Sequence, residues 1–392
     1  MAIATGLDRL LDETGVNRNL KGKRVGLVCN PASVDSRIRH AVDRFSHSSD
    51  CTLAAIFGPQ HGFRSDLQDN MIESPHTEDR SRRVPIYSLY SETREPTREM
   101  LDGINALVVD LQDVGTRIYT FVYTMANCLR AAARHGQHVI VCDRPNPIGG
   151  VAMEGALLQP DYTSFVGQFP IPMRHGMTIG ELARLFNEEY GIGASLEVIP
   201  MRGWTRPQYF NDTGLPWVMP SPNIPTLDSA IVYPGTVLFE GTLVSEGRGT
   251  TRPFEIIGAP WIDGERFAQA MNARSLAGVY FRPAFFEPTF QKHAQQTCGG
   301  CQLHVLDREA FLPVKTAVAM IVEFRREDPA RFAWKEPPYE YEYEKTPIDI
   351  MWGSDRLRKA IEAGVPADEI AESWTGEVAT FEELRGPSLL YR

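Results

Sequence analysis

The fold of this chain is decided by a stretch that begins with Ala106-Leu-Val-Val-Asp110 and ends with His138-Val-Ile-Val-Cys142. Both segments are short, apolar and rich in β-branched residues, which is typical of strands buried on both faces. Residues 119–135, between them, carry a helical pattern of apolar positions. A buried strand, a helix and a second buried strand predict a parallel sheet that is covered by helices.

The same rhythm continues on both sides of this stretch. Further strand-like segments lie at residues 25–30, 53–57, 84–90 and 196–200, and a further helical pattern lies at 96–103. Thr178-Ile-Gly-Glu181 has the form of a capping box, a common start of a helix. We therefore expect residues 1–228 to form an α/β domain with a mainly parallel sheet.

The second half of the chain has a different pattern. Residues 211–226 are rich in Pro and turn-forming residues, so irregular backbone and a domain boundary are expected there. Beyond them lie helical patterns at 263–274 and 314–327 and strand-like segments at 279–286 and 302–306. Cys298-Gly-Gly-Cys301 is interpreted as a turn between strands, because a single C-x-x-C lacks the other ligands of a zinc site. The chain has 392 residues, which suits two domains, and residues 229–392 are expected to form a smaller α+β domain.

The bulk composition argues against several classes of partner. With a net charge of −10 and no basic stripe, the chain is not expected to bind nucleic acid. No apolar run approaches the ~20 residues of a membrane span, and the first residues do not read as a signal peptide. The six cysteines are scattered, which fits a reducing compartment. The chain is therefore predicted to be cytoplasmic, with no membrane partner.

Familiar cofactor motifs are missing from the sequence. It contains no Gly-x-Gly-x-x-Gly after the first strand and no Walker A, Gly-x-Ser-x-Gly or His-Glu-x-x-His motif. Asp110, Asp113 and Asp143 have the chemistry of Mg²⁺ ligands. Arg117 and Arg144 lie close to them in the sequence, so ion pairs that hold the loops are the favoured explanation. The sequence predicts neither a metal nor an organic cofactor.

Three polar loops follow strands of the predicted sheet, at residues 58–68, 110–119 and 143–150. Ligands of such sheets bind beyond the carboxyl ends of the strands, so these loops are expected to form one side of a cleft. The candidate binding residues in the first two loops are His61, Arg64, Asp66, Asp113, Arg117 and Tyr119. Asn223, in the Pro-rich segment, is a further candidate unless that segment is a simple linker.

A Gly- and Thr-rich loop at residues 240–255 opens the second domain. It carries Glu240, Glu246, Arg248 and Arg252. The two carboxylates are candidates for an acid and a stabilising group, and the arginines are candidates for substrate binding. The alternative is a turn that is held together by Glu–Arg pairs.

Four long motifs in fixed order resemble one known family. They are Gly-Pro-Gln-His-Gly-Phe-Arg-Ser-Asp at 58–66, Asp-Leu-Gln-Asp-Val-Gly-Thr-Arg-Ile-Tyr-Thr at 110–120, Asp-Arg-Pro-Asn-Pro at 143–147 and Phe-Glu-Gly-Thr-x-x-Ser-x-Gly-Arg-Gly-Thr at 239–250. In these motifs, and from about residue 6 to residue 392, the chain is similar to the exo-β-N-acetylmuramidase family. The resemblance implies a Rossmann-like N-terminal domain, a smaller C-terminal domain and a cleft between them. It also implies removal of terminal N-acetylmuramic acid from the non-reducing end of peptidoglycan fragments.

The implied partner is a small amino sugar or muropeptide, and its lactyl carboxylate calls for an arginine. Arg64, Arg117, Arg248 and Arg252 are the candidates. Glycoside cleavage also needs a proton donor and, as a rule, a second carboxylate.

Position 60 departs from the family pattern. Many members have Glu-His-Gly where this chain has Gln60-His61-Gly62, and the resemblance implies that this Glu is the catalytic acid. A Gln side chain cannot donate a proton as an acid, so Glu246 becomes the candidate acid, with Glu240 as the second carboxylate. His61 is a candidate for positioning water or a neighbouring group. One alternative is an amino-sugar-binding protein that has lost its acid, and another is a different hydrolase or a Mg²⁺-dependent phosphoryl-handling enzyme.

Overall fold

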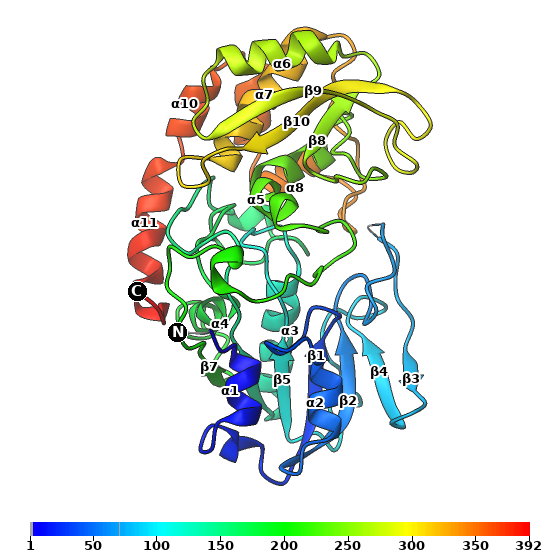
Figure 1. Ribbon diagram of the computed structural model, residues 1–392, viewed down its shortest axis with the longest axis vertical. Coiled ribbons are helices and arrows are strands. Elements are labelled where there is room, and N and C mark those ends of the chain that lie inside the picture. The colour runs from blue at the N-terminus through cyan, green and yellow to red at the C-terminus, as the bar shows by residue number, and fades with distance from the viewer. Residues whose placement is uncertain (1–2, 70) are drawn as a thin grey trace.

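The N-terminal lobe is built around one large sheet. The computed structural model describes residues 3–69 and 71–392, and within them seven strands form this sheet in the order β3-β4-β2-β1-β5-β6-β7 (Figure 1). The strands are β1 (Lys23–Cys29), β2 (Cys51–Gly58), β3 (Thr77–Asp79), β4 (Val84–Ser88), β5 (Ala106–Asp110), β6 (His138–Cys142) and β7 (Ser195–Ile199). All neighbours are parallel except β3, which is antiparallel to β4 at the edge. The mainly parallel sheet expected from the sequence is confirmed.

The strand order is that of a Rossmann fold. Without the edge strand β3, the order β4-β2-β1-β5-β6-β7 matches the 3-2-1-4-5-6 order of dinucleotide-binding sheets. The order reverses between β1 and β5, where Val25 pairs with Ala106. At this point the Pro-rich segment folds over the strand ends, and Asn30 Nδ2 donates a hydrogen bond to the Pro220 carbonyl at 2.7 Å. The place that takes a dinucleotide in related sheets is thus covered by the chain itself.

Four helices accompany this sheet: α1 (Gly6–Asp12), α2 (Ala41–Ser46), α3 (Phe121–His135) and α4 (Ile179–Glu188). The capping box predicted for α4 is present, with Thr178 and Glu181 bonded to each other's backbone amides. The helix expected at 96–103 is wrong, because these residues form turns. Gly103 ends that segment at φ 68°, and so short a segment cannot sustain a helix by itself.

The C-terminal lobe has a smaller antiparallel sheet in the order β8-β10-β9. Its elements are β8 (Ile256–Ala259), β9 (Val279–Phe286), β10 (Cys298–Val305), α6 (Gly264–Ala273) and α7 (Pro313–Glu327). The turn expected at residues 298–301 is wrong, since these residues begin β10. A Cβ on Gly300 would lie 2.0 Å from the Ile257 carbonyl oxygen, so the glycine allows two strands to approach closely.

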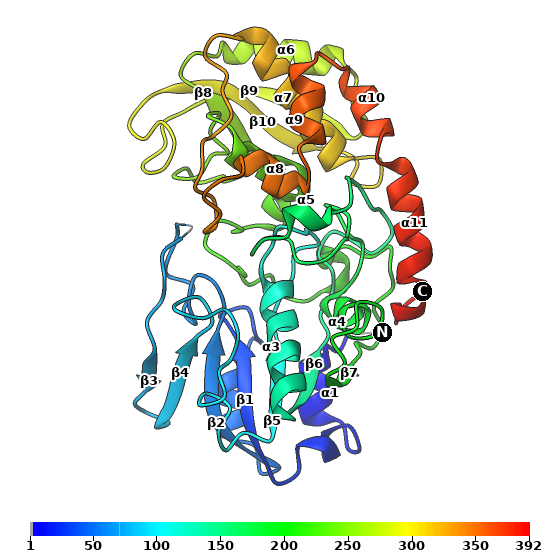
Figure 2. The same cartoon turned by 180° about the vertical axis from the view of Figure 1, so that it is seen from behind.

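Five more α-helices lie in the part of the chain that the structure describes: α5 (Leu227–Thr236), α8 (Pro347–Trp352), α9 (Arg356–Glu362), α10 (Ala367–Glu372) and α11 (Thr375–Arg385). Figures 1 and 2 show α11 running back along the molecule, so that both termini lie beside the N-terminal lobe. There the Leu390 amide donates to Glu181 Oε1 at 2.8 Å. No helix among the described residues is long and apolar enough to cross a membrane.

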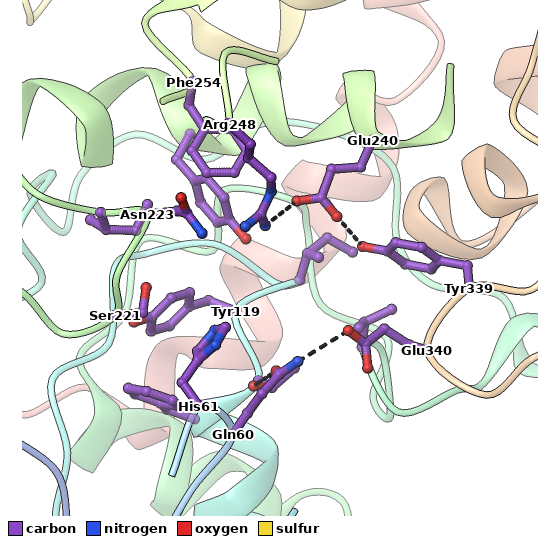
Figure 3. Close-up of a pocket in the computed structure, with 16 residues that line it drawn as sticks. Gln60, His61, Tyr119, Ser221, Asn223, Glu240, Arg248, Phe254, Tyr339 and Glu340 are labelled. Atoms are coloured by element: carbon purple, nitrogen blue, oxygen red, sulfur yellow. Dashed lines mark hydrogen bonds and ion pairs between the residues drawn. The ribbon is translucent and has the colours of Figure 1, made fainter. Parts of the chain in front are cut away.

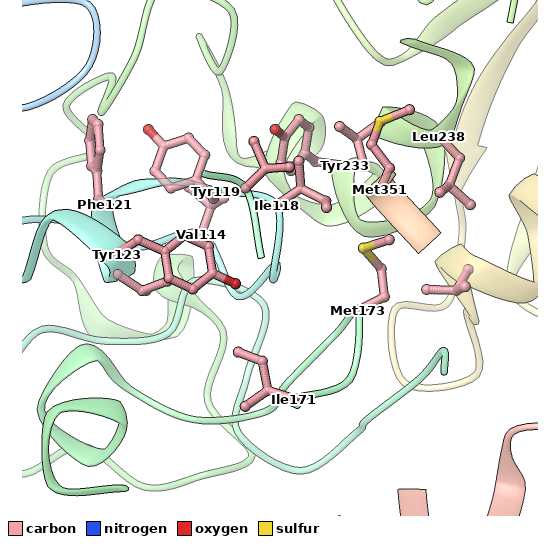
Figure 4. Packing of buried hydrophobic residues seen from close by; sticks show 14 of the residues in the cluster. Val114, Ile118, Tyr119, Phe121, Tyr123, Ile171, Met173, Tyr233, Leu238 and Met351 are labelled. Carbon is pink, nitrogen blue, oxygen red and sulfur yellow. The ribbon is translucent and has the colours of Figure 1, made fainter. Parts of the chain in front are cut away.

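One hydrophobic core continues from lobe to lobe. Figure 4 shows Ile118 and Met173 of the first half beside Tyr233, Leu238 and Met351 of the second, and all five belong to the same buried cluster. Burying apolar surface of this kind contributes roughly 25 cal/mol per Å². The two lobes are therefore packed on each other, and the position of a site between them is fixed.

Candidate active site

A cavity of about 450 Å³ lies where the lobes meet. This volume includes space that is open to solvent. Its polar lining consists of Gln60, His61, Tyr119, Thr120, Ser221, Asn223, Tyr233, Glu240, Arg248, Tyr339 and Glu340, and its apolar lining of Ile118, Phe121, Val166, Ile224 and Phe254 (Figure 3). The first lobe contributes loops that follow β2 and β5, as expected for an open parallel sheet.

The loop after β2 is a tight and strained turn. The Gly62 amide donates to the Pro59 carbonyl at 3.0 Å, and His61 has φ 69°. Such a φ is uncommon for a residue with a side chain and marks backbone that the surrounding fold holds in place. His61 Nδ1 lies 2.7 Å from the Leu67 carbonyl, so Nδ1 carries the proton and donates. Burial is the main cause that lowers the pKa of His61 to about 4, which leaves the ring neutral with Nε2 as an acceptor.

Gln60 connects the two lobes. Its Oε1 accepts a hydrogen bond from Thr120 Oγ1 at 2.6 Å, and its Nε2 donates to Glu340 Oε1 at 3.0 Å. The Thr120 hydroxyl identifies Oε1 as the acceptor, because a hydroxyl that donates must face the carbonyl end of the amide. The orientation of the Gln60 amide is therefore set, and its N–H points at a carboxylate of the other lobe.

Glu340 was not identified by sequence reasoning, although it lines the cavity and is 4% exposed. Its other oxygen, Oε2, accepts from the Tyr90 hydroxyl at 2.7 Å. Burial raises the pKa of Glu340; the hydrogen bonds from Tyr90 and Gln60 oppose this, and the charge of Glu240 adds to it. The residue lies in an acidic and aromatic run, Tyr339–Glu344, in which no sequence feature selects position 340 over positions 342 or 344.

The backbone around Glu340 is also strained. Tyr339 and Glu342 exchange backbone hydrogen bonds at 2.9 Å, and the two residues between them have φ 46° (Glu340) and φ 68° (Tyr341). Two positive φ values between paired residues describe a type I′ turn, which favours Asn and Gly. Residues with long side chains in this conformation are costly, and they are found where the position of a side chain matters.

Glu240 lies across the cavity in a charged environment. Arg248 Nη2 donates to its Oε1 at 2.6 Å, and the Tyr339 hydroxyl donates to its Oε2 at 2.8 Å (Figure 3). Burial alone would raise the pKa of Glu240, but the charge of Arg248 and these hydrogen bonds outweigh it and lower the pKa. Glu240 is therefore ionised at neutral pH. Among the described residues, Arg248 Nη1 has no hydrogen-bond partner although it is buried.

Glu246 does not line the cavity. Its Oε2 lies 2.6 Å from Lys292 Nζ, and the same ammonium donates to the carbonyls of Phe239 at 2.7 Å and Val244 at 3.1 Å. Its Oε1 lies 3.5 Å from Arg248 Nε. The structure thus places the acid expected from the sequence behind Arg248, where a lysine neutralises it. Its nearest role in the site is to hold Arg248.

The other predicted residues separate into two groups. Tyr119, Asn223, Arg248, His61 and Gln60 meet in the cavity with Glu240. Arg64, Asp66, Asp113, Arg117 and Arg252 are absent from its lining.

Each residue of the second group has another position. Arg117 is fully buried and donates to the carbonyls of Ala156, Ile171, Met351 and Trp352 at 2.6–2.9 Å, so the substrate-binding role expected for it is replaced by a structural one. Arg252 is exposed and pairs with Glu255 at 3.2 Å. Asp113 lies 3.2 Å from His175 Nε2. Arg64 and Asp66 line a separate hollow beside β4.

The carboxylates that were considered as metal ligands are engaged in other bonds. Arg144 forms a two-pronged ion pair with Asp110 at 2.6 and 2.7 Å, as the sequence led us to expect. Asp143 accepts from Thr178 Oγ1 and from the Gly180 amide, both at 2.8 Å. Within residues 3–69 and 71–392, no group of three or more His, Cys, Asp or Glu side chains has the arrangement of a metal site.

Fold and site together define a class of protein. A Rossmann-like lobe, a smaller antiparallel lobe and two carboxylates that face one cavity between them are the arrangement of a two-domain α/β protein with glycosidase-type chemistry. The family models for the N- and C-terminal parts of the exo-β-N-acetylmuramidase NamZ match residues 25–228 and 231–391. The chain therefore belongs to the NamZ exo-β-N-acetylmuramidase family.

Individual relatives agree with this assignment. The peptidoglycan β-N-acetylmuramidase NamZ of Bacillus subtilis (strain 168) is 45% identical over 390 residues, which cover 99% of this chain and 91% of that protein. The crystal structure of a DUF1343 family protein from Bacteroides fragilis NCTC 9343 matches with a TM-score of 0.91 and 34% identity, covering 100% of this chain and 99% of the other. A second DUF1343 structure from the same organism matches with the same coverage, a TM-score of 0.78 and 29% identity.

Proposed function

We propose that this protein is a glycoside hydrolase that releases terminal N-acetylmuramic acid from the non-reducing end of peptidoglycan fragments. The family and its Bacillus subtilis relative support this activity. The observation that carries it is the pair Glu240 and Glu340, which face one cavity while their pKa values are shifted in opposite directions. An ionised carboxylate and a carboxylic acid with a raised pKa are the pair that glycoside cleavage requires.

Arg248 supports recognition of an acidic sugar. Its Nη2 is bound to Glu240, whereas its Nη1 is buried without a partner among the described residues. An unsatisfied buried donor is costly until a ligand supplies an acceptor. The lactyl carboxylate distinguishes N-acetylmuramic acid from N-acetylglucosamine, and it supplies such an acceptor with a full negative charge.

The shape of the site supports removal of one terminal sugar. Asn223 lines both the cavity and a more open hollow, whose other lining includes Pro225, Pro253, Phe286 and Phe290. The hollow leaves room for the glycan that follows a terminal sugar in the cavity.

The thiols support the compartment that we propose, which is the cytoplasm. All six cysteines are free, and five of them are buried. Unpaired thiols persist where the environment is reducing. Small amino sugars and muropeptides from cell-wall turnover are then the substrates, and fractionation of cells that express the untagged protein tests the location.

Three β-glycosides test the activity. The disaccharide with N-acetylmuramic acid at its non-reducing end and 4-nitrophenyl β-N-acetylmuramide are both expected to release N-acetylmuramic acid, which mass spectrometry detects. 4-Nitrophenyl β-N-acetylglucosaminide lacks the lactyl group and is expected to react at least ~10-fold more slowly, because a charge-assisted hydrogen bond contributes about 1.5–3 kcal/mol. Binding of N-acetylmuramic acid by calorimetry without any turnover would instead identify an amino-sugar-binding protein.

A further inference from the structure

The cavity contains few groups that can hold a proton at neutral pH and give it up to a glycosidic oxygen. Glu240 is bound to Arg248 and accepts from Tyr339, so it is an anion. His61 donates through Nδ1 to a backbone carbonyl and is neutral, so its Nε2 accepts a proton and has none to give. The lining tyrosines Tyr119, Tyr233 and Tyr339 have pKa values raised by burial and are too weak as acids.

Glu340 differs from these groups in its partners. The described residues include no ion pair to its carboxyl, and the two groups that bond to it, the Gln60 amide and the Tyr90 hydroxyl, are neutral. Each oxygen has two lone pairs, so both of these bonds leave room for a proton on the carboxyl. Burial is the largest influence on its pKa and favours the neutral acid; of the two charged residues that act on it without bonding to it, Glu240 raises the pKa and Arg94 lowers it.

The strained turn is an independent observation about the same residue. Glu340 and Tyr341 occupy the two central positions of a type I′ turn although neither is Gly or Asn. The turn carries the Glu340 carboxyl from the C-terminal lobe to the loop after β2 in the N-terminal lobe, where Gln60 holds it. Unfavourable backbone that delivers one side chain to a cavity is a mark of function.

We propose that Glu340 is the proton donor of the glycosidic cleavage, with Gln60 as the positioning residue that holds its carboxyl. The inference rests on the proposed function. As the bond between the anomeric carbon and the glycosidic oxygen breaks, the electron pair stays on the oxygen and the Glu340 proton is transferred to it. The hydroxyl of a water molecule ends on the anomeric carbon, and the remaining proton of that water replaces the one that Glu340 gave. Glu240 stays ionised throughout and stabilises positive charge on the sugar ring.

The test compares two leaving groups on the same sugar. A sugar alcohol leaves only when it is protonated, whereas 4-nitrophenolate leaves without a proton. Glu340→Gln is therefore expected to lower kcat/KM for the disaccharide by ~10²–10⁴-fold, the usual contribution of general acid catalysis, and to lower kcat/KM for 4-nitrophenyl β-N-acetylmuramide by about tenfold or less. Glu344→Gln, an exposed acid of the same run, is the matched control and should change neither value.

The outcomes separate the two proposals. Equal losses on both substrates by a folded E340Q variant, or no loss on either, would overturn the role of Glu340 while the hydrolase remains. Wild-type protein that cleaves neither substrate would overturn the hydrolase itself. If E340Q does not fold, Glu340→Asp gives the same comparison. Its side chain is shorter by one methylene, so the acid lies farther from the glycosidic oxygen. This variant is expected to lose more kcat/KM on the disaccharide than on the nitrophenyl glycoside.

Discussion

Glu240 and Glu340 are the same residue type in the same cavity, and both are 4% exposed, yet their pKa values are shifted in opposite directions. Glu240 faces a guanidinium at 2.6 Å, whereas Glu340 faces an amide at 3.0 Å and a phenol at 2.7 Å. Burial acts on both alike and favours the neutral acid. The charge of the partner therefore decides the direction in which the pKa of each carboxyl is shifted.

This contrast also explains why a neutral residue at position 60 is compatible with the proposed chemistry. An amide N–H orients Glu340 without adding a charge. A lysine or arginine at that position would ionise Glu340 in the way that Arg248 ionises Glu240. The four predictions that follow test this comparison, beginning with the largest expected effect.

Glu240→Gln is expected to lower kcat by ~10²–10³-fold, a loss typical of removing a group that stabilises charge in the transition state. It also removes the nearer of the two anions that pair with the buried Arg248, which costs up to about 3–5 kcal/mol of unfolding free energy. Steady-state kinetics and urea unfolding measure the two effects. Glu246→Gln is the comparison variant, because Glu246 bonds to Lys292 outside the cavity. A larger loss of kcat in E246Q than in E240Q would identify Glu246 as the acid.

Gln60→Glu is expected to move the alkaline limb of the kcat/KM profile to higher pH by about one unit or more. The variant places a second carboxyl against Glu340, and two such groups share one proton because like charges disfavour ionisation. Gln60→Met, which removes the bond to Glu340 without adding a charge, is the control. If the Q60E profile coincides with that of the wild type, Glu340 does not set this limb.

The pH dependence of stability should have opposite slopes for the two carboxyls. The raised pKa of Glu340 stabilises the fold fully below the ordinary value of 4.5, and this contribution is lost as pH rises through the folded pKa. The lowered pKa of Glu240 stabilises the fold above 4.5, and this contribution is lost as pH falls through the folded pKa. The difference in unfolding free energy between wild type and E340Q should thus decrease with pH, and that between wild type and E240Q should increase. If both differences change with pH in the same direction, the pKa values of the two carboxyls are not shifted in opposite directions.

The smallest effects are expected from the two tyrosine hydroxyls. Tyr339→Phe removes the hydrogen bond to Glu240, and Tyr90→Phe removes the one to Glu340. A hydrogen bond to a charged group contributes about 1.5–3 kcal/mol and one between neutral groups about 0.5–1.5 kcal/mol. Tyr339→Phe should therefore destabilise the protein more at pH 7, as thermal unfolding would measure. The reverse order would mean that Glu340 is the ionised member of the pair.

Much of the fold was accessible from the sequence. The bounds expected for β5 and β6 agree with the structure residue for residue, because uninterrupted β-branched segments between polar loops have few other ways to be buried. The structure of residues 96–103 was harder to predict, because local interactions give a short, isolated helical segment little stability. In β10, the two glycines suggested a turn because their close packing against Ile257 and Ile262 is visible only in three dimensions.

The site was only partly accessible. Sequence reasoning located the loops after β2 and β5 and the loop of Glu240 and Arg248, since polar motifs at strand ends and Gly-rich loops are local features. It assigned a binding role to Arg117, whose four carbonyl partners come from three distant segments. It also chose Glu246 as the acid, because the Lys292 that neutralises it is 46 residues away.

The sequence by itself determined the parallel sheet, the polar edge at its strand ends and the family. These properties follow from local patterning, which the order of residues carries directly. Only the tertiary structure decided in which direction the pKa of each carboxyl is shifted, because a pKa depends on the partners that folding brings together. Glu340 meets Gln60 across 280 positions of sequence, and the contact that gives it a role exists only when the two lobes are packed on each other.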